Sequence, residues 1–365
     1  MFSIESNNSF SAIRVLISIA AIVIIIAGIY LAQSVVVLFL VSFFLASLGI
    51  PSLLWLKEKH IPSGFAVFIV MAVMIIILLI ISAQIGSSFS TFVSELPLLQ
   101  SRIREQVSEL TAIISSKEFV VNEKFFLEYV NPEAIMKLTA NLLTGLSSIL
   151  SDLVLILLTV TFILLEASSF PIKLRSILGD PKQKFPQFTK FIDDMKRYMV
   201  IKTLISLATG ILIAFWLYIL GVDYPILWGF IAFLLNYIPN IGSIVAAIPA
   251  VILAFIQYGI GSAIMVTAGY IVVNFIIGNV IEPRLMGRKL GLSTLVVFLS
   301  LIFWGALLGL VGAILSIPLT MTLKFAFESG ESTKWIAVLL GSEKFDELSA
   351  PISKRRKDND NYSSE

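Results

Sequence analysis

The sequence contains no cysteine and a single histidine, His60, among its 365 residues. Without cysteine, the chain forms neither a disulfide nor a thiolate metal site. One histidine gives no support to a histidine-based metal site or to a Ser-His-Asp triad. The glycine-rich loop that cradles nucleotide phosphates is also missing, which argues against ATP hydrolysis. We therefore expect a protein that is not an enzyme and needs no cofactor.

Charged residues are scarce as well. They make up 14% of the sequence, against about 25% in a typical soluble protein. Five blocks lack Asp, Glu, Lys, Arg and His altogether: Val15–Leu56, Ile61–Ser94, Thr203–Val222, Tyr224–Ile281 and Leu290–Leu323. Because about 18 uncharged apolar residues can cross a hydrocarbon core of about 30 Å, these blocks predict insertion into a lipid bilayer. The net charge of +2 is too small to indicate a nucleic-acid partner.

The predicted fold is all-α, a polytopic helical membrane protein with about six full spans, two helical hairpins and a small extracytoplasmic helical segment. The expected spans are Ile13–Leu31, Val35–Leu56, Gly64–Ile85, Asn141–Leu165, Leu204–Leu220 and Gly261–Ile281. The first is longer than a signal-peptide core and lacks a convincing cleavage site, so we interpret it as a retained span. The chain then divides into a three-span scaffold (1–85), an extracytoplasmic amphipathic segment (86–140), the fourth span (141–165), a basic cytoplasmic loop (166–202), a core of two spans and two hairpins (203–327) and a cytoplasmic tail (328–365).

Basic residues predict the orientation. Residues 166–202 carry eight Lys or Arg, whereas the longer segment 86–140 carries five, together with seven Glu. Lys57 and Lys59 follow the second span, and Lys-Arg-Arg-Lys at 354–357 lies in the tail. Since cytoplasmic loops are enriched in Lys and Arg, both termini are expected in the cytoplasm and residues 86–140 outside.

The outer segment has helical character. Ile103, Val107, Leu110 and Ile114 recur at helical spacing, and Asn131-Pro132-Glu133 resembles a helix start. We interpret it as a small helical cap, with a surface for docking a partner as the alternative. Residues 354–365 are polar and expected to be disordered.

Tyr224–Tyr258 is too long for one crossing, because a single helix of this length would extend about 52 Å. It is interrupted at Asn236-Tyr237-Ile238-Pro239-Asn240-Ile241-Gly242. Pro239 removes a backbone donor, and Gly242 permits a turn. Each arm falls short of the roughly 17–25 residues of a full span, which predicts a re-entrant hairpin. Its exposed backbone groups, with the amides of Asn236 and Asn240, would line a solute path; close helix packing by Pro and Gly is the alternative.

Leu290–Leu323 follows the same logic. Gly305, Gly309 and Gly312 weaken the helix between two apolar arms. An Ile-Pro pair follows each tip, ending at Pro249 and at Pro318. Each hairpin follows a full span, and a basic loop at 284–289 would make the first open outside and the second inside. A span and hairpin repeated upside down is an arrangement of many secondary transporters; two short crossings in place of each hairpin is the alternative.

These segments resemble the signature of the autoinducer-2 exporter family of membrane permeases. The residues are Trp228-Gly229-Phe230, Asn236-Tyr237-Ile238-Pro239-Asn240-Ile241-Gly242-Ser243, Ile248-Pro249, Ile281-Glu282-Pro283-Arg284-Leu285-Met286-Gly287, Leu292-Ser293, Gly312 and Ile317-Pro318. The resemblance is strong over Lys196–Lys324 and one of general shape over Met1–Arg175. It implies a bacterial inner-membrane permease that forms a homo-oligomer, a pentamer being one candidate. Some relatives are linked to export of autoinducer-2 and others to sodium/proton exchange. Many carry Gly-Gln where this chain has Ile201-Lys202, which suggests a different subgroup.

Three charged residues are candidates for a gate or a coupling site. Glu282 and Arg284 flank Pro283 where the sixth span meets the cytoplasm; an interfacial ion pair is the alternative. Asp152 is a costly intramembrane acid, or it caps its helix near the outer interface. The candidate path residues are Asn236, Pro239, Asn240, Gly242, Gly305, Gly309, Gly312, Asn274 and Asn279, and the candidate hinges are Pro249, Pro283, Gly287 and Pro318.

We therefore expect a secondary transporter that moves a small polar solute or a signal molecule by alternating access. The hairpins and the last two spans would move against a scaffold of the first four spans. A cation/proton antiporter is one alternative, and it would need a protonatable residue such as Glu282 or Asp152. A membrane scaffold that docks partners without transporting anything is another.

Overall fold

The computed structural model describes residues 5–115, 141, 144–145, 151–178, 186–239, 241–286 and 291–341, and helices make up nearly all of them, without a strand. The helices are α1 (Glu5–Leu31), α2 (Gln33–Glu58), α3 (Ser63–Ser115), α6 (Leu153–Leu178), α8 (Pro186–Ile219), α9 (Pro225–Leu235), α10 (Gly242–Tyr258), α11 (Ile260–Phe275), the π-helix η1 (Ile276–Ile281), α12 (Glu282–Met286), α13 (Thr294–Ile314), α14 (Ser316–Glu328) and α15 (Lys334–Leu340). The predicted all-helical class is confirmed.

Five helical segments are long and apolar enough to cross a membrane: Gln33–Glu58, Ser63–Ser88, Phe188–Ile219, Ile260–Met286 and Thr294–Ile314. The first four correspond to the predicted second, third, fifth and sixth spans. The fifth, α13, was predicted as one arm of a hairpin. The apolar parts of α1 and α6, Leu16–Leu31 and Leu153–Ala167, are shorter. Most of the predicted first part of the fourth span, before 151, lies outside the described residues.

Two predicted boundaries fall inside helices. Helix α3 continues without a break through position 86 to Ser115, so the third span and the start of the outer segment are one helix. Residues 166–202, predicted as a loop, are largely helical, because α6 extends to Leu178 and α8 begins at Pro186. In both places the composition changes from apolar to charged while the backbone stays helical. Residues 116–140 and 342–365 lie outside the described part.

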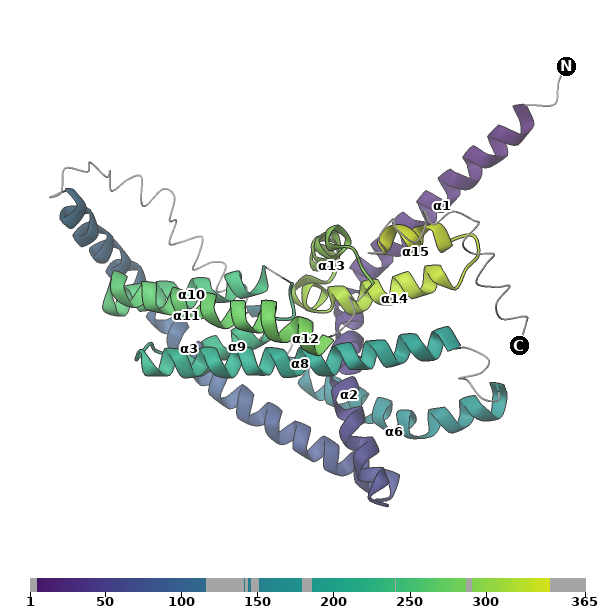
Figure 1. Cartoon of the computed structure of the whole chain (residues 1–365), viewed down its shortest axis with the longest axis horizontal. Coiled ribbons are helices and arrows are strands. Elements are labelled where there is room, and N and C mark those ends of the chain that lie inside the picture. The colour runs from purple at the N-terminus through teal and green to yellow at the C-terminus, as the bar shows by residue number, and fades with distance from the viewer. Residues whose placement is uncertain are drawn as a thin grey trace, which may run out of the picture.

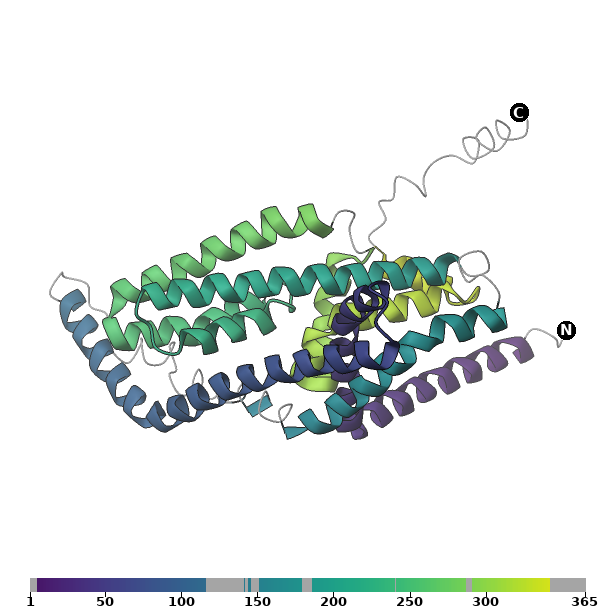
Figure 2. The same cartoon turned by 90° about the horizontal axis from the view of Figure 1, so that it is seen from below.

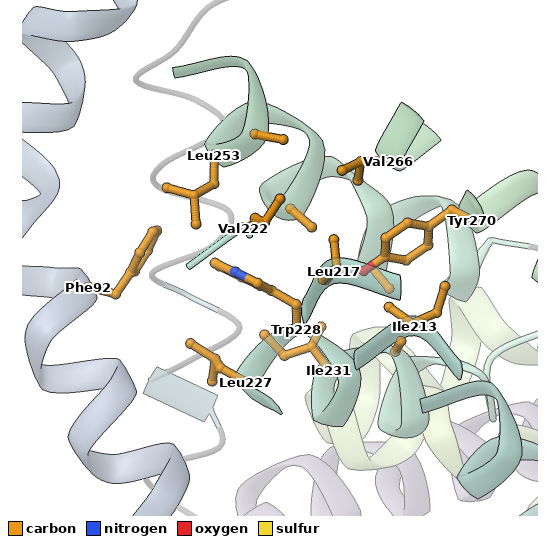
Figure 3. Packing of buried hydrophobic residues seen from close by; sticks show 14 of the residues in the cluster. Phe92, Ile213, Leu217, Val222, Leu227, Trp228, Ile231, Leu253, Val266 and Tyr270 are labelled. Atoms are coloured by element: carbon orange, nitrogen blue, oxygen red, sulfur yellow. The ribbon is translucent and has the colours of Figure 1, made fainter. Parts of the chain in front are cut away.

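Helices α8, α9, α10 and α11 run side by side along the long axis, with α3 next to α9 and α10 (Figures 1 and 2). Helix α2 crosses α8 in Figure 1 and contacts it. Figure 3 shows the core of the group, in which Trp228 of α9 lies between Phe92 of α3 and apolar residues of α8 and α11. Phe92 and Trp228 meet edge to face, with ring centroids 5.3 Å apart. This core fixes α9 and α10 against α8.

Small residues bring α8 and α9 close together. A Cβ added at Gly210 of α8 would lie 2.7 Å from the Gly229 carbonyl oxygen, and one at Gly229 would lie 2.6 Å from the Gly210 carbonyl oxygen. Glycines at such crossings let two backbones approach closely within a membrane. Gly229 therefore serves helix packing.

Large apolar side chains cover the outside of α1, α2, α3, α8, α11 and α13. On α1, for example, Ile24 is 70% exposed and Leu31 is 85% exposed. Soluble monomers rarely expose contiguous apolar patches larger than a few hundred Å². A lipid environment accounts for this surface.

Candidate functional site

The first predicted hairpin has a tight reversal at its tip. Helix α9 ends at Leu235 after 11 residues, and α10 begins at Gly242. The Gly242 amide donates to the Ile238 carbonyl at 3.3 Å. A Cβ added at Gly242 would lie 1.8 Å from the Leu235 carbonyl oxygen, so a larger residue does not fit without a shift. Pro239 lies in the turn, where its missing N–H breaks no helix. Asn240 is outside the described residues.

The second predicted hairpin also has a glycine reversal. Within α13, Gly309 has φ 64° and ψ −147°, a non-helical conformation that kinks the helix. A Cβ added at Gly312 would lie 2.0 Å from the Trp304 carbonyl oxygen. The Trp304 indole N–H donates to the Thr320 hydroxyl at 3.0 Å and thereby ties α13 to α14. Gly305 is less constrained, because its added Cβ would make an ordinary 3.7 Å contact with Ala313.

Each reversal is followed by a buried proline, as the sequence comparison of the two hairpins predicts. Pro249 lies inside α10, where it removes a helical donor, and Pro318 lies in the first turn of α14, where none is needed. Both prolines are buried. Their different positions in the helices mean that the two second arms are similar in sequence and not equivalent in local structure.

The two reversals share one apolar cluster. Tyr237 of the first tip and Val311 and Ile314, which follow the second reversal, are buried in it together with Tyr198 and Met199 of α8. The Phe44 ring of α2 meets Tyr237 edge to face, with centroids 5.4 Å apart. Segments far apart in the sequence therefore converge on the first tip.

Helix α8 presents a buried polar stripe to this tip, formed by Tyr198, Lys202, Ser206 and Thr209. Their spacing of three or four residues places them on one face. The Asn236 amide donates to the Ser206 hydroxyl at 3.0 Å. The Tyr237 hydroxyl donates to the neighbouring Thr203 hydroxyl at 2.7 Å, and Thr203 donates to the Met199 carbonyl. The first tip is thus held to α8 by side-chain hydrogen bonds as well as by packing.

Glu282 at the start of α12 pairs with Lys202 of the polar stripe. The Lys202 Nζ to Glu282 Oε1 distance is 2.8 Å, and the two side chains are 6% and 24% exposed. This differs from the predicted partnership of Glu282 with Arg284, which is exposed. Arg284 lies two residues along the same helix, and such residues do not face each other. Lys202, predicted in a cytoplasmic loop, is instead buried in α8.

The pair lies next to a distorted stretch of helix. Residues Ile276–Ile281 form a π-helix, and the Glu282 amide donates to the Ile277 carbonyl, five residues back. Pro283 has no N–H, so it cannot continue the helical bonding, and its ring crowds the preceding turn. Single π-turns of this kind are frequent at functional sites. Gly287 lies outside the described residues.

The remaining candidates are less concentrated. Asn274 is half-buried in α11, and Asn279 is exposed in the π-helix. Asp152 is exposed in a turn directly before α6. A negatively charged side chain at this place is stabilised by the positive end of the helix dipole. Its position agrees with a helix cap. Among the described residues, no three His, Cys, Asp or Glu side chains gather to hold a metal ion.

The part of α3 that follows its apolar stretch contacts the open end of the first hairpin. The Tyr224 hydroxyl, in the turn before α9, donates to a Glu95 carboxylate oxygen at 2.9 Å. Burial, followed by this hydrogen bond, raises the pKa of Tyr224 to about 12. The Phe92 ring packs edge to face on Tyr224 with centroids 6.1 Å apart. Helix α3 and the residue that precedes α9 are thus in direct contact.

Sequence reasoning missed the polar stripe and the Lys202–Glu282 pair. The stripe had a local signal, because positions 198, 202, 206 and 209 recur at helical spacing within an apolar stretch. The pair had none, since its partners are 80 residues apart.

Comparisons with known proteins identify the family. The model of a family described as AI-2E family transporter matches residues 19–332. The AI-2 transport protein TqsA of Escherichia coli (strain K12) is 39% identical over 332 residues, covering 91% of this chain and 96% of that protein. The protein YhhT of the same strain is 34% identical over 91% of this chain and 95% of its own length. A relative in Haemophilus influenzae is 37% identical over 92% and 98%.

Proposed function

Because this chain belongs to the AI-2E family of transporters, we propose that it is a secondary permease for a small polar solute, with a path past the tips of two re-entrant hairpins. The observation that carries the proposal is the pair of glycine reversals at Gly242 and Gly309–Gly312. Each folds a helical arm back on itself, and the residues around both meet in one buried cluster.

Helix ends at membrane depth leave main-chain carbonyl and amide groups without helical partners. Such groups are tolerated when they are buried in protein or line a wet cavity. At the first tip they lie beside Asn236 and the polar stripe of α8, whose hydroxyls add donors and acceptors. A hydrated solute could exchange water for these groups, which favours this region as the binding site.

Movement of the hairpins would expose the proposed binding site alternately to the two sides of the membrane. Helix α9 has 11 residues and is too short to cross the hydrocarbon core. Helix α13 is long enough by residue count, but the Gly309 kink interrupts it. We propose that each hairpin enters and leaves a bacterial inner membrane on one face, the first hairpin on the outer face and the second on the inner face, with both termini cytoplasmic. We also propose a homo-oligomer, as the family resemblance implies.

The solute is best sought by counterflow. Purified protein in liposomes loaded with unlabelled autoinducer-2, polar metabolites or sodium would be assayed for uptake of each labelled species. TqsA, a relative, is an AI-2 transport protein, so autoinducer-2 is the first candidate. Accumulation of one species above that in empty liposomes would support transport. Failure of the whole panel would contradict a permease for solutes of this kind.

Two substitutions test the site. Asn236→Ala and Ser206→Ala each remove the same 3.0 Å hydrogen bond from opposite sides, so both should lower flux to a similar extent. Ser47→Ala is the matched control, because within the described part of the chain the Ser47 hydroxyl bonds to the Phe44 carbonyl of its own helix and to no other group. Membrane insertion should be unchanged in all three. Equal flux in Asn236→Ala and Ser47→Ala would place the path elsewhere.

A further inference from the structure

We propose that the Lys202 ammonium group is a tethered counter-ion that holds the place of a free monovalent cation beside Glu282. The carboxylate then needs no sodium or potassium ion, and the solute moves without cation coupling at this site. The proposal deepens the permease function, although its binding test does not depend on transport.

The first argument is geometric. Lys202 Nζ lies 2.8 Å from Glu282 Oε1, a distance typical of a charge-assisted hydrogen bond. The Lys202 side chain is buried, with 6% of its area exposed. A cation from solution would have to displace a side chain that the protein already holds in place. Lysine suits this role, because its ammonium is a compact point charge on a flexible stem.

The second argument concerns the charge balance. An isolated carboxylate taken out of water is strongly disfavoured unless a positive charge compensates it. One lysine supplies one positive charge, the same as one sodium or potassium ion. The other ion pairs within the described residues, Lys173–Glu166 and Lys324–Glu328, each join residues of one helix. The Lys202–Glu282 pair joins α8 to α12 and lies beside the π-helix.

The third argument is the set of oxygen atoms around the pair. The Tyr198 hydroxyl, one helical turn before Lys202, is buried and has no hydrogen-bond partner among the described residues. It lies within electrostatic reach of Glu282 and Tyr237. Hard monovalent cations bind oxygen ligands, and both the Glu282 carboxylate and the unpartnered Tyr198 phenol oxygen lie in this region. Removal of the ammonium group would leave ligands suited to such a cation.

The test uses full-length protein purified in detergent. Unfolding temperature would be measured in sodium, potassium and choline chloride at matched ionic strength, for wild type and Lys202→Met. Wild type should not distinguish the three salts. Lys202→Met should gain a saturable stabilisation by sodium or potassium over choline. The double variant Lys202→Met/Glu282→Gln should lose it. Lys173→Met is the matched control, because it removes the lysine of the exposed Lys173–Glu166 ion pair. It should show no stabilisation by sodium or potassium over choline.

Several outcomes would overturn the proposal. One is a saturable sodium or potassium effect in wild type that Glu282→Gln abolishes. Another is a folded Lys202→Met protein that responds equally to all three salts. Lys202→Gln is a second variant for the same measurement, in case Lys202→Met does not fold. Its side-chain amide still donates a hydrogen bond to the Glu282 carboxylate. If Lys202→Met and Lys202→Gln both fail to fold in every salt, a free cation does not replace the ammonium group, and the proposal is wrong.

A flux measurement separates this inference from the proposed function. Counterflow by wild type should be unchanged when sodium is replaced by choline on both sides. Absence of flux for every solute would contradict the permease and leave the salt-dependent unfolding result intact. Flux that requires sodium in wild type would contradict the tethered counter-ion while supporting transport.

Discussion

Replacing Gly242 by alanine should destabilise the first hairpin tip. The added Cβ would lie 1.8 Å from the Leu235 carbonyl oxygen and 2.9 Å from the Ile238 Cβ. A carbon and a carbonyl oxygen rarely approach within about 3.3 Å, so the start of α10 must move by about 1.5 Å. The obstacle is backbone, which cannot rotate away as a side chain could.

The magnitude follows from two opposing effects. Forcing extra volume into a packed site costs about 1–3 kcal/mol, and the rigid carbonyl places this site at the upper end. Alanine recovers up to about 1 kcal/mol of helix propensity relative to glycine. We expect a net loss of about 2 kcal/mol. In a domain of 150–250 residues, each kcal/mol lowers the unfolding temperature by roughly 2–4 °C, so a decrease of several degrees is expected here.

The assay is thermal unfolding in detergent followed by counterflow in liposomes. Gly261→Ala is the matched control, since it also lies in the first turn of a helix and no atom lies within 4 Å of its added Cβ. Gly242→Ala should lose both stability and flux, whereas Gly261→Ala should keep both. If the two variants unfold at the same temperature, the close contact at the tip is not present in the protein and the hairpin geometry must be revised.

Three further predictions follow from the same contacts. Glu282→Gln should lower the free energy of unfolding by about 3–5 kcal/mol, because it leaves Lys202 buried without a counter-charge. In a double-mutant cycle, Lys202→Met/Glu282→Gln should recover most of this loss. Additive losses of the two single variants would contradict a direct ion pair. Gly312→Ala should destabilise more than Gly305→Ala in thermal unfolding, because the added atoms would lie 2.0 Å and 3.7 Å from their nearest neighbours; a reversed order would refute the second reversal. Burial and the Glu95 hydrogen bond raise the pKa of Tyr224 from 10.0 to about 12, so the unfolded chain loses this proton first and stability should fall between those pH values. The stability of Tyr224→Phe should fall less over the same range in a pH series of unfolding temperatures, and parallel curves would count against the buried, hydrogen-bonded position of Tyr224.

The first hairpin reversal could be predicted because its signals are local. Pro239 and Gly242 interrupt an apolar stretch in the sequence, and the structure ends α9 at Leu235 and starts α10 at Gly242. The second was harder to locate from three glycines alone. Of these, Gly309 has the positive φ and Gly312 makes the close contact, while Gly305 does neither. Which glycine turns the chain depends on the neighbouring arm.

The parts that sequence reasoning missed depend on tertiary contacts or on helix continuity. The many charged residues of 166–202 led to the prediction that Lys202 lies in a loop. Lysine is a good helix former, however, and the ion pair with Glu282 compensates its charge within α8. Arg284 seemed the natural partner of Glu282 only because the two are close in sequence. The π-helix before Pro283 had a single local sign, the proline itself, which is also compatible with a simple helix end.

The length of α3 has a mechanical consequence. Its 53 residues give a contour of about 80 Å at 1.5 Å per residue, of which its apolar part, Ser63–Ser88, is enough to cross the hydrocarbon core. The remainder of α3 continues the same helix and contacts Tyr224, at the base of the first hairpin, through Phe92 and Glu95. A binding protein bound to residues 101–115 would therefore act on the base of the first hairpin from a distance, which offers a way to restrain the hairpin movement that the proposed transport cycle requires.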